Sequence, residues 1–523
     1  MCRGLAGRCA EDGRLSRALL DEVQPEAFTL ARLLAERSAA ASLVPWAQAQ
    51  GELERGLAAL YVASFVRNVG QVIAWEGSAF GVDPERASAL AGLRGWVEEA
   101  TSTAVRVGLG RRLLERSHEP SGALGIGDDH REMQRLFARF ADERIAPVAE
   151  EIHRHDRLIP EPLLQELAEL GVFGISIPEE YGGSFIDHLT MCLATEELSR
   201  GSLGAGGSVI TRPEICAKAI LKGGTDDQKR KWLPRIASAE TLVSVAVTEP
   251  NAGSDVAAVR VTAERIEGGW LIDGEKTWCT FAGRADAFIL LARTGTPDSG
   301  HRGLTLFLAE KPAFGAGEDE HSFVHRQEGG GSIEGHAIPT IGYRGMHSYT
   351  VTFDRYFVPE ENRIGEEGKG FILQMQGFAG GRIQTAARAV GVMEAAFRKA
   401  LSYAGERQVF GRSLADFSMT SAKLADMAAT LQASRQLGYH VARQMDEGEG
   451  DMEASLVKLL SCKDAEWLTR EAMQLHGGMG YSEEYAVSRY WQDARVLSIF
   501  EGAEEVLALY VVARQVLAGA LSS

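Results

Sequence analysis

A glutamate near the C-terminus is the residue of this sequence best suited to proton transfer. Glu501 follows Ile499 and Phe500 and precedes Gly502 in the segment IFEGAEEVLALY. A carboxylate at the mouth of an apolar pocket loses hydration, which raises its pKa toward that of a useful general base. The same glutamate would also suit the start of a helix, where the helix dipole favours a negative charge. The segment alone leaves both interpretations open.

Two segments in predicted strand regions have the residues to hold a flat polar ring. In VTEPNAGSD, a tight turn exposes backbone N–H groups and the hydroxyls of Thr248 and Ser254. In GEKTWCTFAG, Trp278 offers a stacking plane and Thr280 a hydrogen bond on the same face of a strand. A common Gly/Ser turn and an ordinary half-buried tryptophan would produce the same patterns.

Two segments in the helical C-terminal region have the residues to hold a charged ligand. In YAGERQVFGRSL, Arg407 lies close to Phe410 and Gly411, and a guanidinium there could bind a diphosphate bidentately. In LHGGMGYSEEY, a glycine-rich break between helices would let a ligand approach the backbone closely. The alternatives are a solvated helix end and a plain turn between helices.

Composition and missing motifs exclude several classes of protein. The 523 residues include 55 Lys and Arg against 72 Asp and Glu, a formal charge of −17, so we expect no nucleic-acid partner. The six cysteines form no C-x-x-C pair, and we predict no metal site. No strand is followed by G-x-G-x-x-G, and neither a Walker A motif nor a G-x-S-x-G elbow occurs.

Hydrophobic patterning predicts a soluble chain with its strands in the middle. The N-terminus has no apolar signal region and no run reaches about 18 uninterrupted apolar residues, so we expect a cytoplasmic protein with no membrane contact. Helical spacing dominates before residue 242 and after residue 366, and we expect breaks in the later helices near 446–451 and at 476–480. We interpret the acidic, glycine-rich stretch 314–335 as a mobile surface insertion. The predicted strands are VSVAVTE (243–249), VRVTAERI (259–266), GWLIDGEKTW (269–278), AFILLART (287–294), LTLFLAE (304–310) and YTVTFDRYFV (349–358).

Together these segments resemble the acyl-CoA dehydrogenase family over roughly residues 130–518. The resemblance is carried by VTEPNAGSD, GEKTWCT, RQVFG, Gln474-x-x-Gly-Gly, the Phe-Glu-Gly near the C-terminus and QKRKWLPRIASAE. It implies a mostly α fold with a central β domain: a helical N-terminal domain, a β-barrel-like middle domain and a C-terminal four-helix bundle, here with an extra N-terminal helical extension. The implied boundaries are 1–120, 128–241, 242–365 and 366–520.

The resemblance also implies chemistry and site residues. Glu501 would be the catalytic base of an FAD-dependent dehydrogenation of an acyl-CoA. Some relatives place the base just before the arginine that matches Arg382, where this chain has Gly381. Ser254 and Arg382 match substrate-binding positions. FAD shared with a neighbouring subunit implies a homodimer or a dimer of dimers. The implied FAD-binding residues are Val247, Thr248, Gly253, Trp278, Thr280, Arg407, Phe410, Gln474 and Gly478.

Some positions depart from the family pattern. Ala503 stands where a threonine is usual, and Gln492 stands where the family has the arginine of an Arg-Asp pair. Val409 precedes Phe-Gly where many relatives carry a polar residue. These departures weaken individual FAD contacts and leave the base unaffected.

Within the family, EELSRG, TRPEI, GYRGMHSYTVTFD, GRIQTAARAVGV and IFEGAEE are most similar to the branch that oxidises (2S)-methylsuccinyl-CoA to 2-methylfumaryl-CoA. That branch belongs to the ethylmalonyl-CoA pathway and passes electrons to electron-transfer flavoprotein. The free carboxylate of such a substrate needs a cation, because burying it unpaired would cost several kcal/mol. We predict Arg212 for this role, with Arg344 as the alternative. The rival functions are dehydrogenation of glutaryl-CoA or a short branched acyl-CoA, and a flavin-binding family member without dehydrogenase activity.

Overall fold

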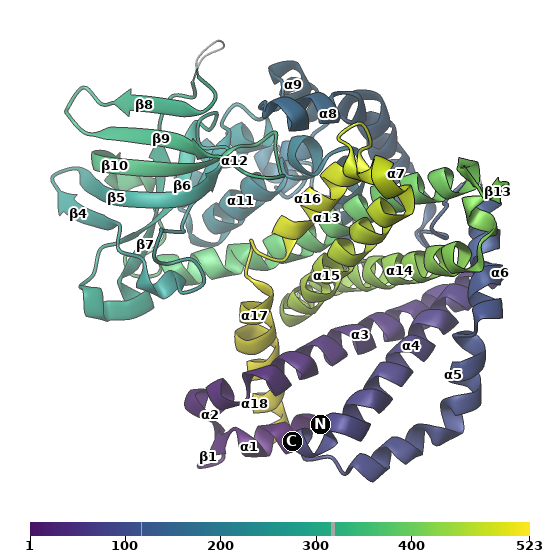
Figure 1. Cartoon of the computed structure of the whole chain (residues 1–523). Helices are drawn as coiled ribbons and strands as arrows, with labels where there is room; N and C mark the ends of the chain where they lie inside the picture. Colours follow the sequence, from purple (N-terminus) through teal and green to yellow (C-terminus); the bar gives the residue numbers. More distant parts are fainter. Residues whose placement is uncertain (117, 315–318, 523) are drawn as a thin grey trace. The chain divides into compact units, whose positions relative to one another are not determined.

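The computed structural model describes residues 1–116, 118–314 and 319–522 (Figure 1). The chain divides into two units. Unit 1 joins Met1–Glu132 to Thr385–Ser523, and unit 2 comprises Met133–Gln384. The N-terminal extension therefore shares a unit with the C-terminal helices, whereas the central strands lie in unit 2.

Unit 1 is built of long helices with two short hairpins. The helix breaks predicted near 446–451 and 476–480 are confirmed by the ends of α14 and α15. The helices α7 (Asp128–Phe140) and α13 (Gly370–Glu406) continue across the division between units. The other elements are α1 (Cys2–Arg8), β1 (Ala10–Glu11), β2 (Arg14–Leu15), α2 (Arg17–Glu22), α3 (Gln24–Gln48), α4 (Glu52–Glu76), α5 (Arg94–Ala100), α6 (Thr103–Leu114), β12 (Gln408–Val409), β13 (Arg412–Ser413), α14 (Ser418–Asp446), α15 (Asp451–His476), α16 (Val487–Leu497), α17 (Glu504–Val506) and α18 (Arg514–Ser522).

The extension packs directly on the C-terminal bundle, with α3, α4 and α6 against α14. Gly110 of α6 permits the closest approach, because a Cβ there would lie 2.0 Å from the backbone oxygen of Ser421. Beside it, Arg106 Nε donates to Asp426 Oδ1 at 2.9 Å across the same helix pair. Part of the extension is therefore shaped to fit α14.

A buried polar network ties the end of the extension to α13 and α14. Ser121 Oγ donates to Glu394 Oε2 at 2.6 Å, and Arg435 Nη2 donates to the same oxygen at 2.9 Å. Gln432 Nε2 donates to the backbone oxygen of Ser121 at 3.1 Å. Burial alone would raise the pKa of Glu394, but Arg398 and Arg435 hold it well below its usual range. The residues after α6 are thus anchored inside the bundle by paired charge.

The first and last helices of the chain also pack together in unit 1, where Leu5, Phe80 and Leu517 share one apolar cluster. Two helical segments here, Glu52–Phe80 and Glu504–Ser522, are long and apolar enough to cross a membrane, with a mean hydropathy of 1.4 in an 18-residue window. Buried core helices often have such a composition, but only 28% and 33% of the two windows is buried within the chain. The absence of membrane contact therefore stays a prediction.

Unit 2 places helices beside a nine-stranded sheet of order β11-β7-β6-β4-β5-β10-β9-β8, in which β3 pairs with β6 in parallel. All six predicted strands are confirmed within a few residues. The helices are α8 (Ala146–His155), α9 (Glu161–Glu169), α10 (His188–Gly201), α11 (Thr211–Gly223) and α12 (Asp226–Ala237). The strands are β3 (Val243–Ala246), β4 (Thr262–Ile266), β5 (Gly269–Thr280), β6 (Ala287–Arg293), β7 (Leu304–Glu310), β8 (Ser322–Arg326), β9 (Ser332–Ile338), β10 (Ser348–Pro359) and β11 (Arg363–Ile364).

The interpretation of residues 314–335 as a mobile insertion is wrong for most of its length. Residues 315–318 lie outside the described chain, but β8 and β9 form an antiparallel hairpin and β9 pairs with β10. The strands escaped prediction because their hairpin forms one end of the sheet, where several side chains stay in solvent and hydrophobic alternation is weak. Three glycines, Gly329–Gly331, form the turn.

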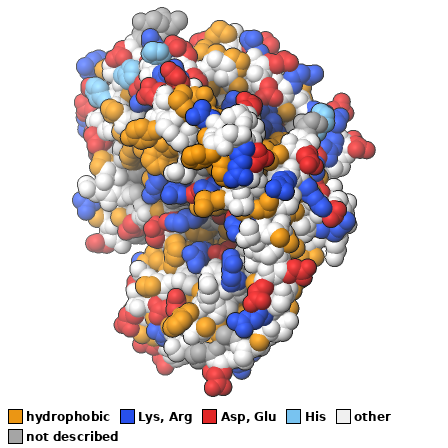
Figure 2. Space-filling view, turned by 45° about the vertical axis from the view of Figure 1, so that its right-hand side comes forward, with side chains coloured by type: hydrophobic (Ala, Val, Ile, Leu, Met, Phe, Trp, Pro, Cys, Tyr) orange, Lys and Arg blue, Asp and Glu red, His pale blue; other side chains and the backbone are white. Residues whose placement is uncertain are grey.

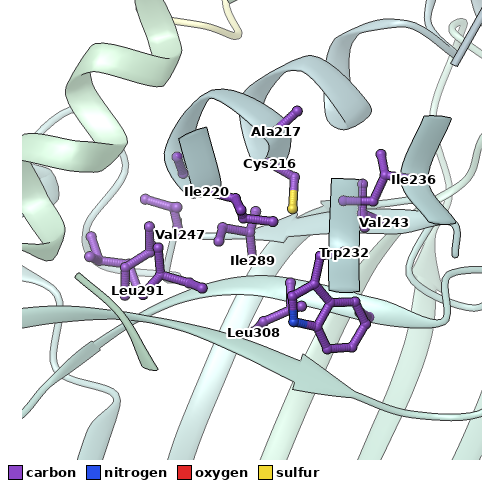
Figure 3. Close-up of a cluster of buried hydrophobic side chains, with 14 of the residues drawn as sticks. Cys216, Ala217, Ile220, Trp232, Ile236, Val243, Val247, Ile289, Leu291 and Leu308 are labelled. Carbon is purple, nitrogen blue, oxygen red and sulfur yellow. The ribbon is translucent and has the colours of Figure 1, made fainter. Parts of the chain in front are cut away.

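Two apolar cores share β6 between them. Its residues are all buried, and they alternate between the two cores: Ile289 and Leu291 contact one, Phe288 and Leu290 the other. In the first core, helix side chains such as Trp232 meet strand side chains (Figure 3). The continuous apolar run AFILLA thus reflects a strand covered on both faces.

Substituting alanine for glycine at positions 108 and 110 of α6 tests the fit of the extension. Alanine normally stabilises a helix by about 0.5–1 kcal/mol relative to glycine. We expect Gly108→Ala to show this gain, since an added Cβ meets nothing within 4 Å there. Gly110→Ala should instead lower the free energy of unfolding by about 1–3 kcal/mol, because its Cβ collides with backbone of α14. Denaturant unfolding of both variants checks this, and equal effects would contradict the packing described.

Candidate functional site

The turn that carries VTEPNAGSD is tethered to β5 by a buried ion pair. Lys276 Nζ donates to Glu249 Oε1 at 2.8 Å and to the backbone oxygen of Val247 at 2.9 Å. The backbone N–H groups of Arg260 and Val261 donate to the same carboxylate at 2.7 and 2.8 Å. Burial lowers the pKa of Lys276, and attraction to Glu249 offsets part of that shift. This pair fixes the turn relative to the strand that bears Trp278.

The tethered turn presents its polar groups outward. Thr248 is half-buried and Gly253 and Ser254 are exposed, while the backbone oxygen of Thr248 accepts from the N–H of Thr277 at 2.8 Å. A Cβ on Gly253 would meet only a methyl of Thr248, at 3.8 Å. Arg382 on α13 is half-buried. The binding roles of these residues stay predictions, and the exposure of Gly253 and Ser254 leaves those two positions accessible to a ligand.

A β-bulge holds Trp278 out of the core. The register of β5 with β10 shifts between the pairs Lys276–Val351 and Cys279–Tyr349, and Trp278 adopts a φ of +58°. Its side chain is 54% exposed. A bulge re-aims a side chain, and positive φ at a bulky residue carries an energetic cost. The strained backbone of this strand therefore lowers stability, and in return the indole ring is exposed at the surface.

Arg212 lies beside the end of this strand. It is 5% exposed, its Nη2 donates to the backbone oxygen of Ser208 at 2.6 Å, and its guanidinium lies 5.9 Å from the ring centre of Phe281. Thr280 is half-buried, with its hydroxyl 3.0 Å from that of Ser348. Unit 2 thus brings Arg212 near the segment that carries Trp278 and Thr280, and its role toward a substrate carboxylate stays a prediction.

Arg344, the alternative cation, already has polar partners at another place in unit 2. Its Nη1 donates to the backbone oxygen of His153 at 2.6 Å, and its Nε lies 3.5 Å from Asp156 Oδ1. Asp156, His321 and His347 present possible metal-ligand atoms within 4.8 Å of one another. However, the guanidinium already faces this carboxylate, and His347 Nε2 lies 3.0 Å from the backbone oxygen of Asp156. We assign the cluster to packing between α8 and β10.

In unit 1, Glu501 is held in a strained conformation between α16 and α17. Its φ is +54°, that of Gly502 is +96°, and its side chain is 14% exposed. Lys458 Nζ donates to the backbone oxygen of Gly502 at 2.6 Å, which secures the bend. A non-glycine residue in the left-handed region costs about 1–3 kcal/mol and persists only where its surroundings enforce it. The segment is therefore not the helix start that was the alternative interpretation.

A buried arginine lies next to this glutamate. Arg388 of α13 is fully buried, and its Nη2 lies 3.9 Å from Glu501 Oε1. The same Nη2 donates to Thr385 Oγ1 at 2.6 Å, and the guanidinium lies 4.7 Å from the ring centre of Phe500. Its Nε and Nη1 are buried with no hydrogen-bond partner among the described residues. Unsatisfied buried donors cost about 1–3 kcal/mol each, so this arginine is arranged for something besides folding.

The other predicted cofactor contacts in unit 1 are exposed. Phe410 and Gly411 form the turn of the β12–β13 hairpin with φ values of +51° and +79°, and the Phe410 side chain is 95% exposed. Arg407 lies beside this hairpin and is exposed, as are Gln474 near the end of α15 and Gly478 just after that helix. A Cβ on Gly478 would meet nothing within 4 Å. The side chains of these residues are therefore mostly uncovered by the rest of unit 1.

One face of the molecule carries side chains of both charges. On the face shown in Figure 2, acidic and basic side chains are interspersed with hydrophobic ones. The net charge of −17 is therefore not segregated on that face.

Three buried charged residues at the candidate site were missed in the sequence. Glu249 and Lys276 were inside the motifs, but only the fold shows that these residues, 27 positions apart in the chain, form a pair. Arg388 was inside the segment GRIQTAARAVGV. The available signal was a single charged residue in an apolar helix face, which normally indicates a buried partner or a ligand.

Comparison with known proteins places the chain among flavin-dependent dehydrogenases of acyl thioesters. The acyl-CoA dehydrogenase N-terminal domain matches residues 127–240, the middle domain residues 244–356 and the C-terminal domain residues 368–517. (2S)-methylsuccinyl-CoA dehydrogenase of Cereibacter sphaeroides is 46% identical over 398 residues, which cover 76% of this chain and 71% of that protein. 2-Methylacyl-CoA dehydrogenase of Solanum tuberosum is 35% identical, covering 75% of this chain and 91% of that protein.

Solved structures agree with this comparison. Butyryl-CoA dehydrogenase from Megasphaera elsdenii matches with a TM-score of 0.67 and 33% identity, covering 74% of this chain and 97% of that chain. A structure titled for the electron transferring flavoprotein of Acidaminococcus fermentans also matches with a TM-score of 0.67, at 32% identity, covering 73% of this chain and 96% of that chain.

Removing Lys276 tests the tether at the candidate site. Lys276→Met would leave Glu249 buried without its partner, and we expect it to lower the free energy of unfolding by about 3–5 kcal/mol. Lys231→Met is the matched control, because Lys231 is half exposed and its nearest carboxylate oxygen, on Glu310, is 3.9 Å away. The control should change stability by less than about 0.5 kcal/mol. Denaturant unfolding measures both, and equal losses would show that the buried pair does not hold the turn.

Proposed function

Because the chain belongs to the acyl-CoA dehydrogenase family, we propose that it oxidises (2S)-methylsuccinyl-CoA to 2-methylfumaryl-CoA. The observation that carries this proposal is the 46% identity to (2S)-methylsuccinyl-CoA dehydrogenase, against 35% for the 2-methylacyl-CoA enzyme. Both relatives cover about the same part of this chain. The difference therefore favours a substrate that is branched next to the thioester and ends in a carboxylate.

The chain is an FAD-dependent oxidoreductase, and its residues fit that cofactor. The exposed indole of Trp278 offers a stacking face. Thr280 offers a hydroxyl two residues further along β5, and Thr248 offers one from the turn whose backbone accepts from the N–H of Thr277. Gly253 and Gly478 leave room for close approach. When bound, FAD supplies the acceptor for the hydrogen that leaves C3 of the acyl group as hydride. Arg407, Phe410 and Gln474 would hold its diphosphate and adenosine.

Glu501 would remove the proton from C2 of the acyl group. An α proton of a thioester is only weakly acidic, so the negative charge that develops on the thioester oxygen needs a hydrogen-bond donor. By family similarity the backbone N–H of Glu501 supplies one. The left-handed backbone conformation at Glu501 fixes the direction of its N–H and of its side chain. Strain at such a residue is tolerated where it serves function.

The partners of the reaction follow from the same proposal. Electron-transfer flavoprotein would accept the electrons. This is supported by one similar solved structure, whose title names that protein. A second copy of the chain would complete each FAD site, because Arg407, Phe410, Gln474 and Gly478 are exposed in one copy. The reaction would serve the ethylmalonyl-CoA pathway in the cytoplasm.

Anaerobic reduction of the flavin by a panel of acyl-CoA esters tests the proposed substrate. We expect (2S)-methylsuccinyl-CoA to bleach the flavin faster than glutaryl-CoA or a short branched acyl-CoA. Glu501→Gln should slow bleaching by about 10²- to 10⁴-fold through loss of the base. Glu505→Gln, an exposed neighbour, is the control and should match the wild type.

Other results would replace the proposal. Faster bleaching by glutaryl-CoA or a branched monocarboxylic ester would assign that substrate instead. Yellow protein that no acyl-CoA bleaches would indicate a flavin-binding member of the family without dehydrogenase activity.

A further inference from the structure

We propose that a cavity between the N-terminal extension and the C-terminal bundle binds a small organic cation, with the carboxylate of Asp464 as its counter-ion. The cavity has a volume of about 320 Å³, within the range of about 300–1,000 Å³ that is usual for pockets holding small molecules. It lies wholly within unit 1. Its wall is formed by α4, α6, α14, α15 and Thr101, which lies between α5 and α6.

The cavity depends on the extension and is separate from the proposed reaction. Tyr61 of α4 and Arg106 of α6 line it, and both precede residue 127, where the match to the family begins. Asp426 of α14 and Asp464 of α15 lie within the matched C-terminal domain. Neither Glu501 nor any residue predicted to hold FAD or substrate is among the described residues that line the cavity. A ligand here would therefore join the extension to the bundle.

Asp464 brings an unpaired carboxyl to the cavity wall. Ser434 Oγ donates to its Oδ2 at 2.8 Å, but its Oδ1 accepts no hydrogen bond and no Lys or Arg pairs with it in the described chain. The neighbouring charge that acts on it is that of Glu36, which is also negative. Burial, with a contribution from this repulsion, raises the pKa of Asp464 to about 7. A bound cation would offset both effects.

The cations near this wall already serve other carboxylates. Arg106 Nε donates to Asp426 Oδ1 at 2.9 Å, and its Nη2 donates to Oδ2 of the same residue. Arg67 is exposed, and its charge acts on Asp426 as well. On α3, Arg32 Nε lies 3.6 Å from Glu36 Oε1. The counter-ion for Asp464 would therefore come from a ligand.

The remaining wall suits the organic part of such a cation. Trp467 follows Asp464 by three residues on α15, so the two side chains lie on one face of the helix, and the indole is 37% exposed. Tyr61 is close enough for the charge of Asp464 to raise its pKa. Aromatic faces attract cations, and Leu60 and Ala429 add apolar surface. The cavity thus fits an ammonium group on an apolar or aromatic body.

Two pairs of probes that differ in charge test the site in the holoenzyme. 2-Phenylethylamine and hexylamine carry an ammonium group, and 2-phenylethanol and hexan-1-ol carry a hydroxyl in its place. Titration calorimetry at pH 8 should show binding of the amines that is tighter by about tenfold or more. Asp464→Asn should weaken amine binding by about tenfold or more and change alcohol binding by less than about twofold, because only the counter-charge is lost.

The pH dependence of binding gives a second readout. The amines stay charged between pH 6 and pH 8, whereas Asp464, with a pKa of about 7, gains a proton as the pH falls. Amine affinity should therefore fall by about tenfold from pH 8 to pH 6, and Asp464→Asn should remove this dependence. Dependence due to any other group would persist in that variant. The other charged or titratable groups that line the cavity or act on Asp464 are Glu36, Tyr61, Arg67, Arg106 and Asp426.

Asp451→Asn is the matched control, because it removes an exposed carboxylate at the start of the same helix, and it should change neither affinity. Trp467→Leu should weaken amine binding by about threefold or more through loss of the ring face. Amines that do not bind the wild type, or that bind Asp464→Asn equally well, would overturn the inference. Should Asp464→Asn fail to fold, unchanged amine affinity in Trp467→Leu would overturn it.

Discussion

A charge that is buried in this protein has to be paired inside it, and much of the fold follows from that constraint. In unit 2, Lys276 and Glu249 neutralise each other and join the VTEPNAGSD turn to β5. In unit 1, Glu394 is neutralised by Arg435 and bonded to Ser121, which anchors the end of the extension to the bundle. Removing one partner of such a pair costs more than the pair contributes, because it leaves an isolated charge without water.

Arg388 departs from this constraint. It is fully buried, its nearest carboxylate is Glu501 at 3.9 Å, and two of its nitrogen atoms have no hydrogen-bond partner among the described residues. A folded protein tolerates this where a ligand completes the set. Backbone strain also occurs at three predicted site residues, since Glu501, Trp278 and Phe410 are among the ten non-glycine residues of the described chain with positive φ. Strain at these three residues is consistent with the roles predicted for them.

Much of the fold could be predicted, because regular hydrophobic spacing is a local property. The run LTLFLAE matches β7 residue for residue, and the break before Asp451 separates α14 from α15. The hairpin β8–β9 could not be predicted, since edge strands expose side chains and lose the alternation that identifies a strand. Nor could the packing of α6 on α14, because Gly110 looks like any helical glycine until its neighbour Ser421 is known.

The sequence by itself determined the family and the cofactor and predicts Glu501 as the base, because each motif is identified by the type and order of residues along the chain. Only the tertiary structure decided which charges meet. Glu249 and Lys276, or Arg388 and Glu501, lie far apart in the chain, and their pairing depends on how strands and helices bring them together. The physical reason is that attraction between charges depends on distance and burial, and neither can be read from residue type.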